Sequence, residues 1–127
     1  MSQIRLTGGL LSVLLLAGCS GDGNAPARAV EDYLDALASK DADRLSLLSC
    51  ADWEDDAQMT LDSFAAVDVA LEGVSCEVGE MEADSALVNC TGAIVTTYEG
   101  ESQELDLTQQ TFEVVQQSGE WLVCEVQ

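Results

Sequence analysis

Five cysteines are the residues of this chain best suited to chemistry, because cysteine sulfur can form a disulfide, bind a metal or carry a covalent group. They stand at positions 19, 50, 76, 90 and 124. The chain has no histidine and no Cys-x-x-Cys pair, so no zinc site is expected, and no other metal or cofactor is indicated. The absence of histidine also excludes a serine hydrolase of the usual triad type, since no imidazole can activate a hydroxyl.

The first cysteine, Cys19, ends the segment Leu16-Ala17-Gly18-Cys19. One cation, Arg5, and an uncharged run over residues 6–17 precede it, which is the pattern of an export signal. The segment resembles the lipobox of bacterial lipoproteins. That resemblance implies that the Cys19 sulfur is alkylated with diacylglycerol, and that cleavage leaves Cys19 as the first residue of the mature chain.

The location of the protein follows from the same segment. Its apolar run of about a dozen residues is short against the ~20 that a membrane-spanning helix needs. An ordinary secretory signal or a retained membrane helix are the alternatives. We expect a domain anchored through the lipid on Cys19 to the outer face of a bacterial membrane, in the cell envelope. Where an outer membrane exists it is the expected one, because Ser20 rather than an aspartate follows Cys19.

The other four cysteines are expected to form disulfides. An odd number of cysteines would leave a free thiol in an exported protein, and assigning Cys19 to the lipid removes that problem. Cys50, Cys76, Cys90 and Cys124 then give two bridges, with three possible connectivities.

Charge narrows the range of partners. After Cys19 the chain has 24 acidic and three basic side chains, a net charge of −21. Nucleic acid is excluded as a partner because phosphate binding depends on clustered Lys and Arg. The acids are spread along the chain and do not follow the spacing of a calcium loop, so a solvated shell is favoured over the alternative, a surface that binds cations or a basic partner. The expected organisation is a signal peptide over 1–18, the lipidated cysteine and a flexible tether over 19–25, and one domain over 26–127.

The first half of that domain has the periodicity of helices. Apolar residues recur at i, i+3, i+4 and i+7, in the order Val30, Tyr33, Leu34 and Leu37. This spacing predicts an amphipathic helix from Pro26 to Ser39. Asp41 can cap a second, shorter helix, and the acidic residues between 52 and 56 suit the first turn of a third. The inward face of the third helix is expected to hold Trp53, Ala57, Thr60, Leu61 and Phe64.

After Ala66 the hydrophobic period changes to two, which predicts strands. The first expected strand covers residues 67–78, and a one-residue phase slip at Glu72-Gly73 predicts a β-bulge within it. Further strands are expected over 86–98, over 105–114 with a similar slip, and over 121–126. Turns at 79–84, 99–101 and 118–119 separate them, so the sheet is expected to be an antiparallel meander.

Helices grouped first and strands grouped after them predict an α+β domain, with three N-terminal helices packed on a curved four-stranded antiparallel sheet. This order, and the opening segment from Val30 to Asp41, resemble the nuclear transport factor two-like superfamily, a cone-shaped, cystatin-like fold that includes ketosteroid isomerase and SnoaL-type polyketide cyclases. The closing segment Gly119-Glu120-Trp121-Leu122-Val123 is similar to that superfamily's last hairpin. The resemblance covers nearly all of the mature chain.

The predicted hairpin gives a preferred disulfide pairing. A bridge between Cys76 and Cys90 would close the hairpin of the first two strands. Cys50 would then pair with Cys124 and tie the end of the second helix to the last strand. The other two connectivities stay open, because the preference depends on the hairpin alone.

The resemblance implies a candidate pocket inside the cone, lined by Tyr33, Trp53, Phe64 and Phe112. In ketosteroid isomerases a tyrosine on the first helix donates a hydrogen bond to the substrate oxygen, and a carboxylate after the second helix moves the proton. Tyr33 stands at the tyrosine's place, but the carboxylate's place falls on Ala57. Asp56 is adjacent, although one helical step of about 100° turns its side chain away from a shared pocket.

Two functions are compatible with these residues. The first is a non-catalytic domain that binds an apolar small molecule in the cone or a protein of the envelope. The second is a small isomerase or lyase that uses Tyr33 with a nearby carboxylate such as Asp55 or Asp56. A carboxylate converging with Tyr33 on one ligand atom would favour the enzyme, and a cone filled by aromatic side chains would favour the binding domain.

Overall fold

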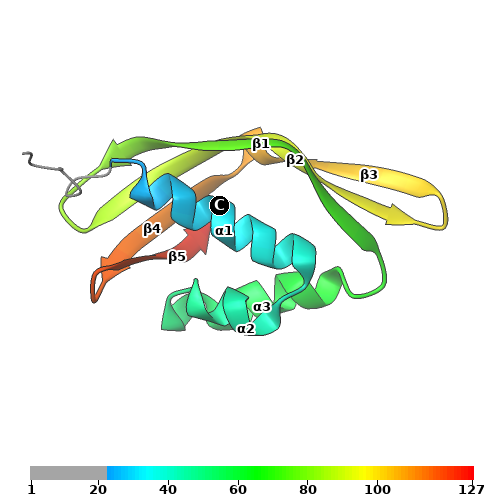
Figure 1. The fold of residues 1–127 in the computed structure, drawn as a ribbon, viewed down its shortest axis with the longest axis horizontal. Coiled ribbons are helices and arrows are strands. Elements are labelled where there is room, and N and C mark those ends of the chain that lie inside the picture. Colours follow the sequence, from blue (N-terminus) through cyan, green and yellow to red (C-terminus); the bar gives the residue numbers. More distant parts are fainter. Residues whose placement is uncertain (1–22) are drawn as a thin grey trace, which may run out of the picture.

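The computed structural model describes residues 23–127, which form three α-helices packed on one antiparallel sheet (Figure 1). The helical part comprises α1 (Ala25–Ser39), α2 (Ala42–Leu47), the 3-10 turn η1 (Ala51–Trp53) and α3 (Glu54–Ser63). The strands are β1 (Asp68–Met81), β2 (Ser85–Tyr98), β3 (Glu101–Asp106), β4 (Thr111–Gln117) and β5 (Glu120–Val126), with a 3-10 turn η2 (Leu107–Gln109) between β3 and β4. The expected α+β class and the three helices are confirmed.

The export signal and the lipidated cysteine expected at Cys19 lie outside the described residues, and so does most of the tether. Within residues 23–127 no helix combines the length and the apolar composition that crossing a bilayer requires.

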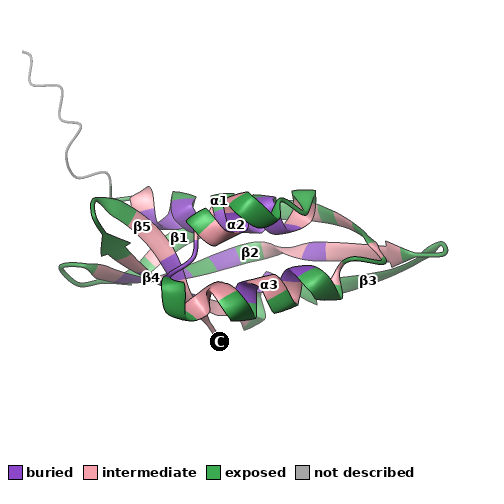
Figure 2. Ribbon diagram, turned by 90° about the horizontal axis from the view of Figure 1, so that it is seen from below, coloured by how far each residue is buried: buried purple, intermediate pink, exposed green. Residues whose placement is uncertain are grey.

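Helix α1 supplies the centre of the core. Pro26 lies in its first turn, where the missing N–H costs no hydrogen bond, and the helix ends at Lys40 in the left-handed conformation. The sheet arches over α1, and α2 and α3 lie beyond α1 (Figure 1). More than half of the residues of α1 are buried, and they appear as purple segments of the ribbon in Figure 2. The stripe expected from the sequence is fully buried, namely Val30, Tyr33, Leu34 and Leu37.

Polar contacts fix the short helices around α1. The Arg44 guanidinium of α2 pairs with Asp35 of α1 at 2.8 Å, and the Gln58 amide of α3 donates to the Ala42 carbonyl of α2 at 3.0 Å. Asp41 caps α2 by accepting from the Arg44 backbone N–H at 3.1 Å, as expected from the sequence. Lys40 donates to the Val67 carbonyl and so ties the turn after α1 to the start of the sheet.

The sheet has five strands, so the expected count of four was wrong. The predicted third strand is two strands, β3 and β4, which pair with different parts of β2. Asp106 causes the break, because its carboxylate accepts from the Thr108 backbone N–H at 2.9 Å and from the Thr108 hydroxyl at 2.7 Å. These bonds cap η2, whose first residue Leu107 is completely buried against β2. The hydrogen bonds of the Asp106 side chain therefore stabilise a turn at this point in place of a continuous strand.

The β-bulge predicted at Glu72-Gly73 is confirmed. Glu72 pairs with Ala93 and Ser75 pairs with Thr91, so two residues of β1 oppose only Gly92 of β2. Gly92 has φ +93°, and a Cβ added to it would lie 2.5 Å from the Gly73 carbonyl oxygen. Only glycine fits this close approach, which bends the long β1–β2 hairpin.

The two disulfides are Cys76–Cys90 and Cys50–Cys124, the pairs that the predicted hairpin favoured. Cys76 and Cys90 are directly paired residues of β1 and β2, and their Cα atoms are 4.0 Å apart. Cys50 follows α2 and Cys124 lies in β5, with Cα atoms 4.9 Å apart. Two bridges in so small a domain suit an oxidising, extracytoplasmic compartment.

Candidate functional site

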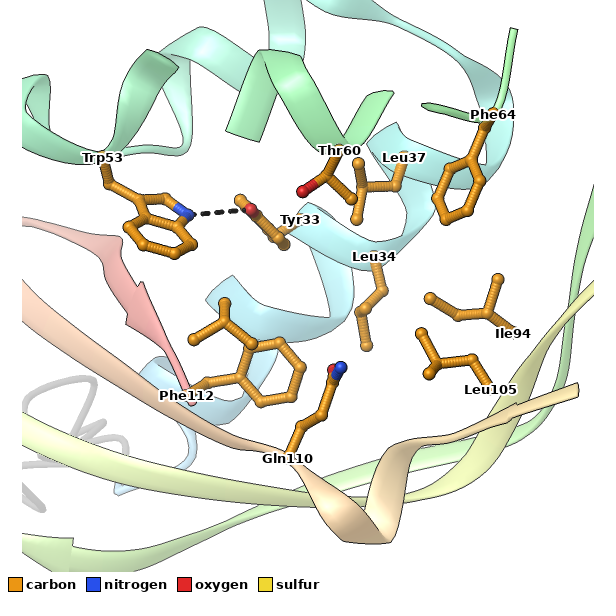
Figure 3. Close-up of a pocket in the computed structure, with 11 residues that line it drawn as sticks. Tyr33, Leu34, Leu37, Trp53, Thr60, Phe64, Ile94, Leu105, Gln110 and Phe112 are labelled. Atoms are coloured by element: carbon orange, nitrogen blue, oxygen red, sulfur yellow. Dashed lines mark hydrogen bonds between the residues drawn. The ribbon is translucent and has the colours of Figure 1, made fainter. Parts of the chain in front are cut away.

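A cavity of about 80 Å³ lies between α1, α3 and the inner face of the sheet. Figure 3 shows the side chains that enclose it. The lining residues are Tyr33, Leu34, Leu37, Trp53, Thr60, Phe64, Ile94, Leu105, Gln110, Phe112 and Val126. The four residues that the sequence indicated for a pocket, Tyr33, Trp53, Phe64 and Phe112, all lie in this wall.

Tyr33 is the most chemically capable residue of the wall. It lies on the buried face of α1 with 2% of its surface exposed. Its hydroxyl oxygen accepts a hydrogen bond of 2.9 Å from Trp53 Nε1, drawn as a dashed line in Figure 3. Burial raises the pKa of Tyr33; the bond from Trp53 lowers that pKa, and the negative charge of Asp56 raises it, with a net upward shift. The phenol therefore stays protonated at neutral pH, and its own hydrogen can be donated to a ligand.

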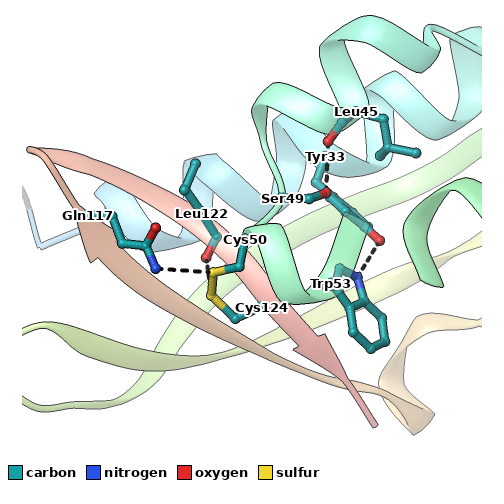
Figure 4. Close-up of a disulfide and its surroundings, with 8 residues drawn as sticks. All are labelled: Tyr33, Leu45, Ser49, Cys50, Trp53, Gln117, Leu122 and Cys124. Atoms are coloured by element: carbon teal, nitrogen blue, oxygen red, sulfur yellow. Dashed lines mark hydrogen bonds between the residues drawn. A yellow bond between two sulfur atoms is a disulfide. The ribbon is translucent and has the colours of Figure 1, made fainter. Parts of the chain in front are cut away.

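Trp53 is held in place by the segment in front of it. Trp53 ends η1, and its backbone N–H donates to the Cys50 carbonyl at 2.9 Å. Cys50 is in turn bound to Cys124 through the disulfide, and its N–H donates to the Val123 carbonyl at 2.9 Å. The disulfide thus lies close to the tryptophan that binds Tyr33 (Figure 4).

Aromatic and aliphatic groups make up most of the remaining wall. Phe112 comes from β4 and is 1% exposed, while Phe64 stands at the C-terminal end of α3 and is half-buried. Leu34 and Ile94 approach from α1 and β2 (Figure 3). Such a lining favours an apolar ligand, and the small volume limits that ligand to a few heavy atoms.

Gln110 is a polar residue of the wall that sequence reasoning missed. It directly follows η2 and is half-buried, and its amide points into the cavity in Figure 3. The η2 cap that positions it depends on Asp106, whose pKa is lowered by the hydrogen bonds from the hydroxyl and backbone N–H of Thr108. The spacing Asp106-x-Thr108 is a local capping signal that could have indicated this turn.

No carboxylate lies among the residues that line this cavity. Asp55 and Asp56 are both exposed in the first turn of α3, outside the wall, although Asp56 is close enough for its charge to act on Tyr33. A proton transfer needs an acceptor within about 2.6–3.2 Å of the proton that moves. The arrangement therefore offers a hydrogen-bond donor to a ligand without a base beside it. Residues 23–127 also contain no cluster of side chains suited to holding a metal ion.

Two further polar contacts lie near the Cys50–Cys124 bridge (Figure 4). Ser49 is buried and donates its hydroxyl to the Leu45 carbonyl at 2.7 Å, which closes the end of α2. The Gln117 amide of β4 donates to Cys50 Sγ at 3.7 Å. The first contact lies within the end of α2 and the second joins Cys50 to β4, and none of these residues lines the cavity.

Comparison with known proteins shows the fold. The structure is similar to an NTF2-like protein with a cystatin-like fold from Novosphingobium aromaticivorans, with TM-score 0.60 and 15% identity over 83% of this chain and 79% of the other. It is similar to a candidate dehydratase of the NTF2-like family from Streptomyces avermitilis, with TM-score 0.57 and 16% identity over 80% and 90%. The association domain of C. elegans CaMKII has TM-score 0.58 and 15% identity over 84% and 97%. No protein-family model and no curated protein matches the chain.

Proposed function

From the NTF2-like, cystatin-like fold of this chain, we propose that the protein is a lipid-anchored domain of the cell envelope that binds a small apolar molecule in its cone without transforming it. The observation that carries this proposal is the mostly apolar cavity, in which Tyr33 is paired with Trp53 and no carboxylate lines the wall. The ligand class is a compact apolar molecule with one acceptor oxygen, because the Tyr33 hydroxyl and the Gln110 amide are the donors that face the cavity.

The alternative, an isomerase or lyase, lacks a specific observation in its favour. A candidate dehydratase is among the similar structures, but that likeness concerns the fold. Asp55 and Asp56 are exposed and lie outside the cavity wall. A buried phenol with a raised pKa can hold an oxygen atom of a ligand, whereas abstraction of a proton needs a base that this wall does not contain.

The envelope location is supported by two independent features. The described domain carries two disulfides, which persist in oxidising compartments. The segment Leu16-Ala17-Gly18-Cys19 supplies the lipidation signal. Two or three acyl chains on one cysteine hold a protein at a bilayer almost permanently, since each buried methylene contributes about 0.8 kcal/mol.

Binding of cyclopentanone, an apolar ring with one carbonyl, tests the ligand site. We expect saturable binding, detected by ligand-observed NMR and by a change in Trp53 fluorescence. Thr60→Leu should abolish it by filling the cavity, because Thr60 lines the wall. Ser63→Leu makes a comparable change at an exposed position of the same helix and should leave binding unchanged. Equal binding by both variants would contradict the proposed site.

Labelling of Cys19 tests the anchor. Wild-type protein should incorporate labelled fatty acid and be processed, whereas Cys19→Ala should accumulate as an unlipidated precursor. Normal lipid labelling of the Cys19→Ala variant would contradict the assignment. Native mass spectrometry of the purified protein then identifies any molecule that occupies the cone.

A further inference from the structure

A second concavity opens on the outside of the domain, at the end where α1 begins. It is a groove of about 370 Å³, and its apolar residues are Ala25, Ala29, Leu47, Leu48, Trp121 and Leu122. Leu47 is 75% exposed, the largest exposure among the large apolar side chains of residues 23–127 that face solvent. Leu47 lines the groove together with the half-buried Trp121 and Leu122, so it belongs to an apolar surface and is not an isolated exposed side chain.

The walls of the groove are joined by strong contacts. One wall is the end of α2 with Leu48, and the other is the start of β5 with Trp121 and Leu122. The Val123 N–H donates to the Leu48 carbonyl at 2.9 Å, and the Cys50–Cys124 disulfide links the same two segments (Figure 4). The groove is therefore preformed, and binding there does not first have to order a flexible segment.

The groove lies where the chain enters the domain. Ala25 is both the first residue of α1 and a lining residue. The first turn of α1 and the turn between β4 and β5 lie at the same end of the molecule in both views (Figure 1, Figure 2). Five residues lie between Cys19 and Ala25, and the six steps along the chain from Cys19 to Ala25 span at most roughly 20 Å at about 3.3–3.6 Å per residue. A lipid on Cys19 would keep this groove close to the bilayer surface.

We infer that the groove is the surface with which the domain rests on the bilayer, with Leu47 and Trp121 entering the interface of a zwitterionic phospholipid. This inference rests on the lipid anchor proposed above. Trp prefers the level of the headgroups, where its ring is partly apolar and its N–H stays hydrated. The tether turns docking into an intramolecular step with a high effective concentration, so a small apolar contact suffices.

The charges of the groove and of the whole mature chain favour a zwitterionic lipid over an anionic one. The rim of the groove carries one cation, Arg28, and two carboxylates, Asp32 and Glu120. Asp32 already pairs with Arg44 at 3.5 Å, so Glu120 is the carboxylate that a headgroup ammonium would meet. An anionic bilayer would repel the mature chain, with its net charge of −21. The same charge disfavours a second copy of this chain as the occupant, since two strongly acidic domains repel each other.

Quenching of tryptophan fluorescence by lipid tests this inference. The chain has two tryptophans, so Trp53→Phe leaves Trp121 as reporter and Trp121→Phe leaves Trp53. Each lipidated protein is placed in zwitterionic phosphatidylcholine vesicles that carry brominated acyl chains. We expect Trp121 to be quenched at least about threefold more strongly than Trp53, because an interfacial side chain reaches about 5–10 Å into the headgroup and acyl boundary. Phosphatidylglycerol in the vesicles should weaken the quenching of Trp121, and added salt should restore it.

Two matched substitutions at exposed apolar positions sharpen the test. Leu47→Glu should lower the quenching of Trp121 to the level of Trp53. Met59→Glu, at a 66% exposed position of α3 outside the groove, should leave it unchanged. If Trp53→Phe fails to fold, amide hydrogen exchange of the unaltered protein replaces it. Residues 46–49 and 120–122 should then exchange more slowly on vesicles than in detergent-free solution after removal of the lipid.

Flotation separates the possible failures. A protein that floats with the vesicles while Trp121 is quenched no more than Trp53 overturns the docking inference and leaves the anchor intact. Shielding of Trp121 by a protein partner or a second copy would give that result. A protein that does not float, and that carries no lipid, overturns both the anchor and the docking surface.

Discussion

The cone cavity and the groove at the start of α1 differ in size and in the exposure of their walls. The cone cavity is small, about 80 Å³, and it is enclosed by side chains that belong to the core, such as Leu34 and Phe112. The groove beside α1 is larger, about 370 Å³, and includes the exposed Leu47. Residues of the cone therefore contribute to stability and to ligand binding together, whereas residues of the groove can change with little cost to the fold.

The Cys50–Cys124 bridge joins the segment that holds Trp53 of the cavity wall to strand β5, which lines the groove. Its removal should therefore cause the largest loss of stability. Replacing both cysteines by alanine should lower the free energy of unfolding by about 4.5 kcal/mol in the loop-closure relation for a long loop, since the bridge spans 74 residues. The equivalent change at Cys76 and Cys90, which are 14 residues apart, should cost about 3 kcal/mol. Urea unfolding without reductant measures both. A smaller loss at the longer loop would contradict this ranking.

Phe112→Ala and Leu47→Ala compare the cone with the groove directly. Phe112 is 1% exposed, so its truncation should lower the free energy of unfolding by about 3–5 kcal/mol through lost burial and a larger cavity. Leu47 is 75% exposed, and its truncation should change stability by less than about 0.5 kcal/mol. Denaturant midpoints give the comparison. A large loss at Leu47 would show that the groove is part of the core.

Trp53→Phe removes the donor to Tyr33 but keeps an aromatic ring. The loss of one largely buried hydrogen bond should cost about 1 kcal/mol of stability. The pKa of Tyr33 should rise further, because the bond from Trp53 lowers it. Absorbance of the phenolate during an alkaline titration reports this pKa when all variants also carry Tyr98→Phe, since Tyr33 and Tyr98 are the two tyrosines of the chain. Trp121→Phe is the control and should leave that titration unchanged, since Trp121 lies in the groove.

Alkaline pH should lower the free energy of unfolding through ionisation of Tyr33. Its pKa is raised in the folded state, chiefly by burial, so the associated stability is complete below the unfolded value of about 10 and is lost as pH rises through the folded pKa. The slope is at most about 1.4 kcal/mol per pH unit. Tyr33→Phe should lack this component when unfolding is measured between pH 9 and 11. An identical pH profile for both proteins would argue against a strongly buried phenol.

Much of the fold was predictable because its signals are local. The spacing of Val30, Tyr33 and Leu34 fixes the buried face of α1 whatever packs against it. The phase slip at Glu72-Gly73 marked the bulge in β1. The break between β3 and β4 was missed because an alternating pattern on both sides of Asp106 suggests one strand, and the capping role of Asp106 was not weighed against it.

The sites were predictable only in part, since cavities are formed by residues distant in sequence. Tyr33 and Phe112 were indicated by their aromatic character and by a resemblance to a cone-shaped fold. Gln110 enters the wall only because η2 turns the chain, and no hydrophobic pattern marks it. The spacing of Ala42, Leu45 and Leu48 predicts one buried face and leaves Leu47 outside it, but nothing local shows that Trp121 and Leu122 lie beside Leu47 in a groove.

The positions of the bridged cysteines also impose an order on maturation. Synthesis delivers Cys50 first, then Cys76 and Cys90 together, and Cys124 in the final strand. The hairpin pair can join while the remainder is still emerging, but Cys50 must wait as a thiol and can be captured by either hairpin cysteine. Correct oxidation of this chain therefore depends on a disulfide-exchanging catalyst, or on the hairpin closing early enough to remove the wrong partners.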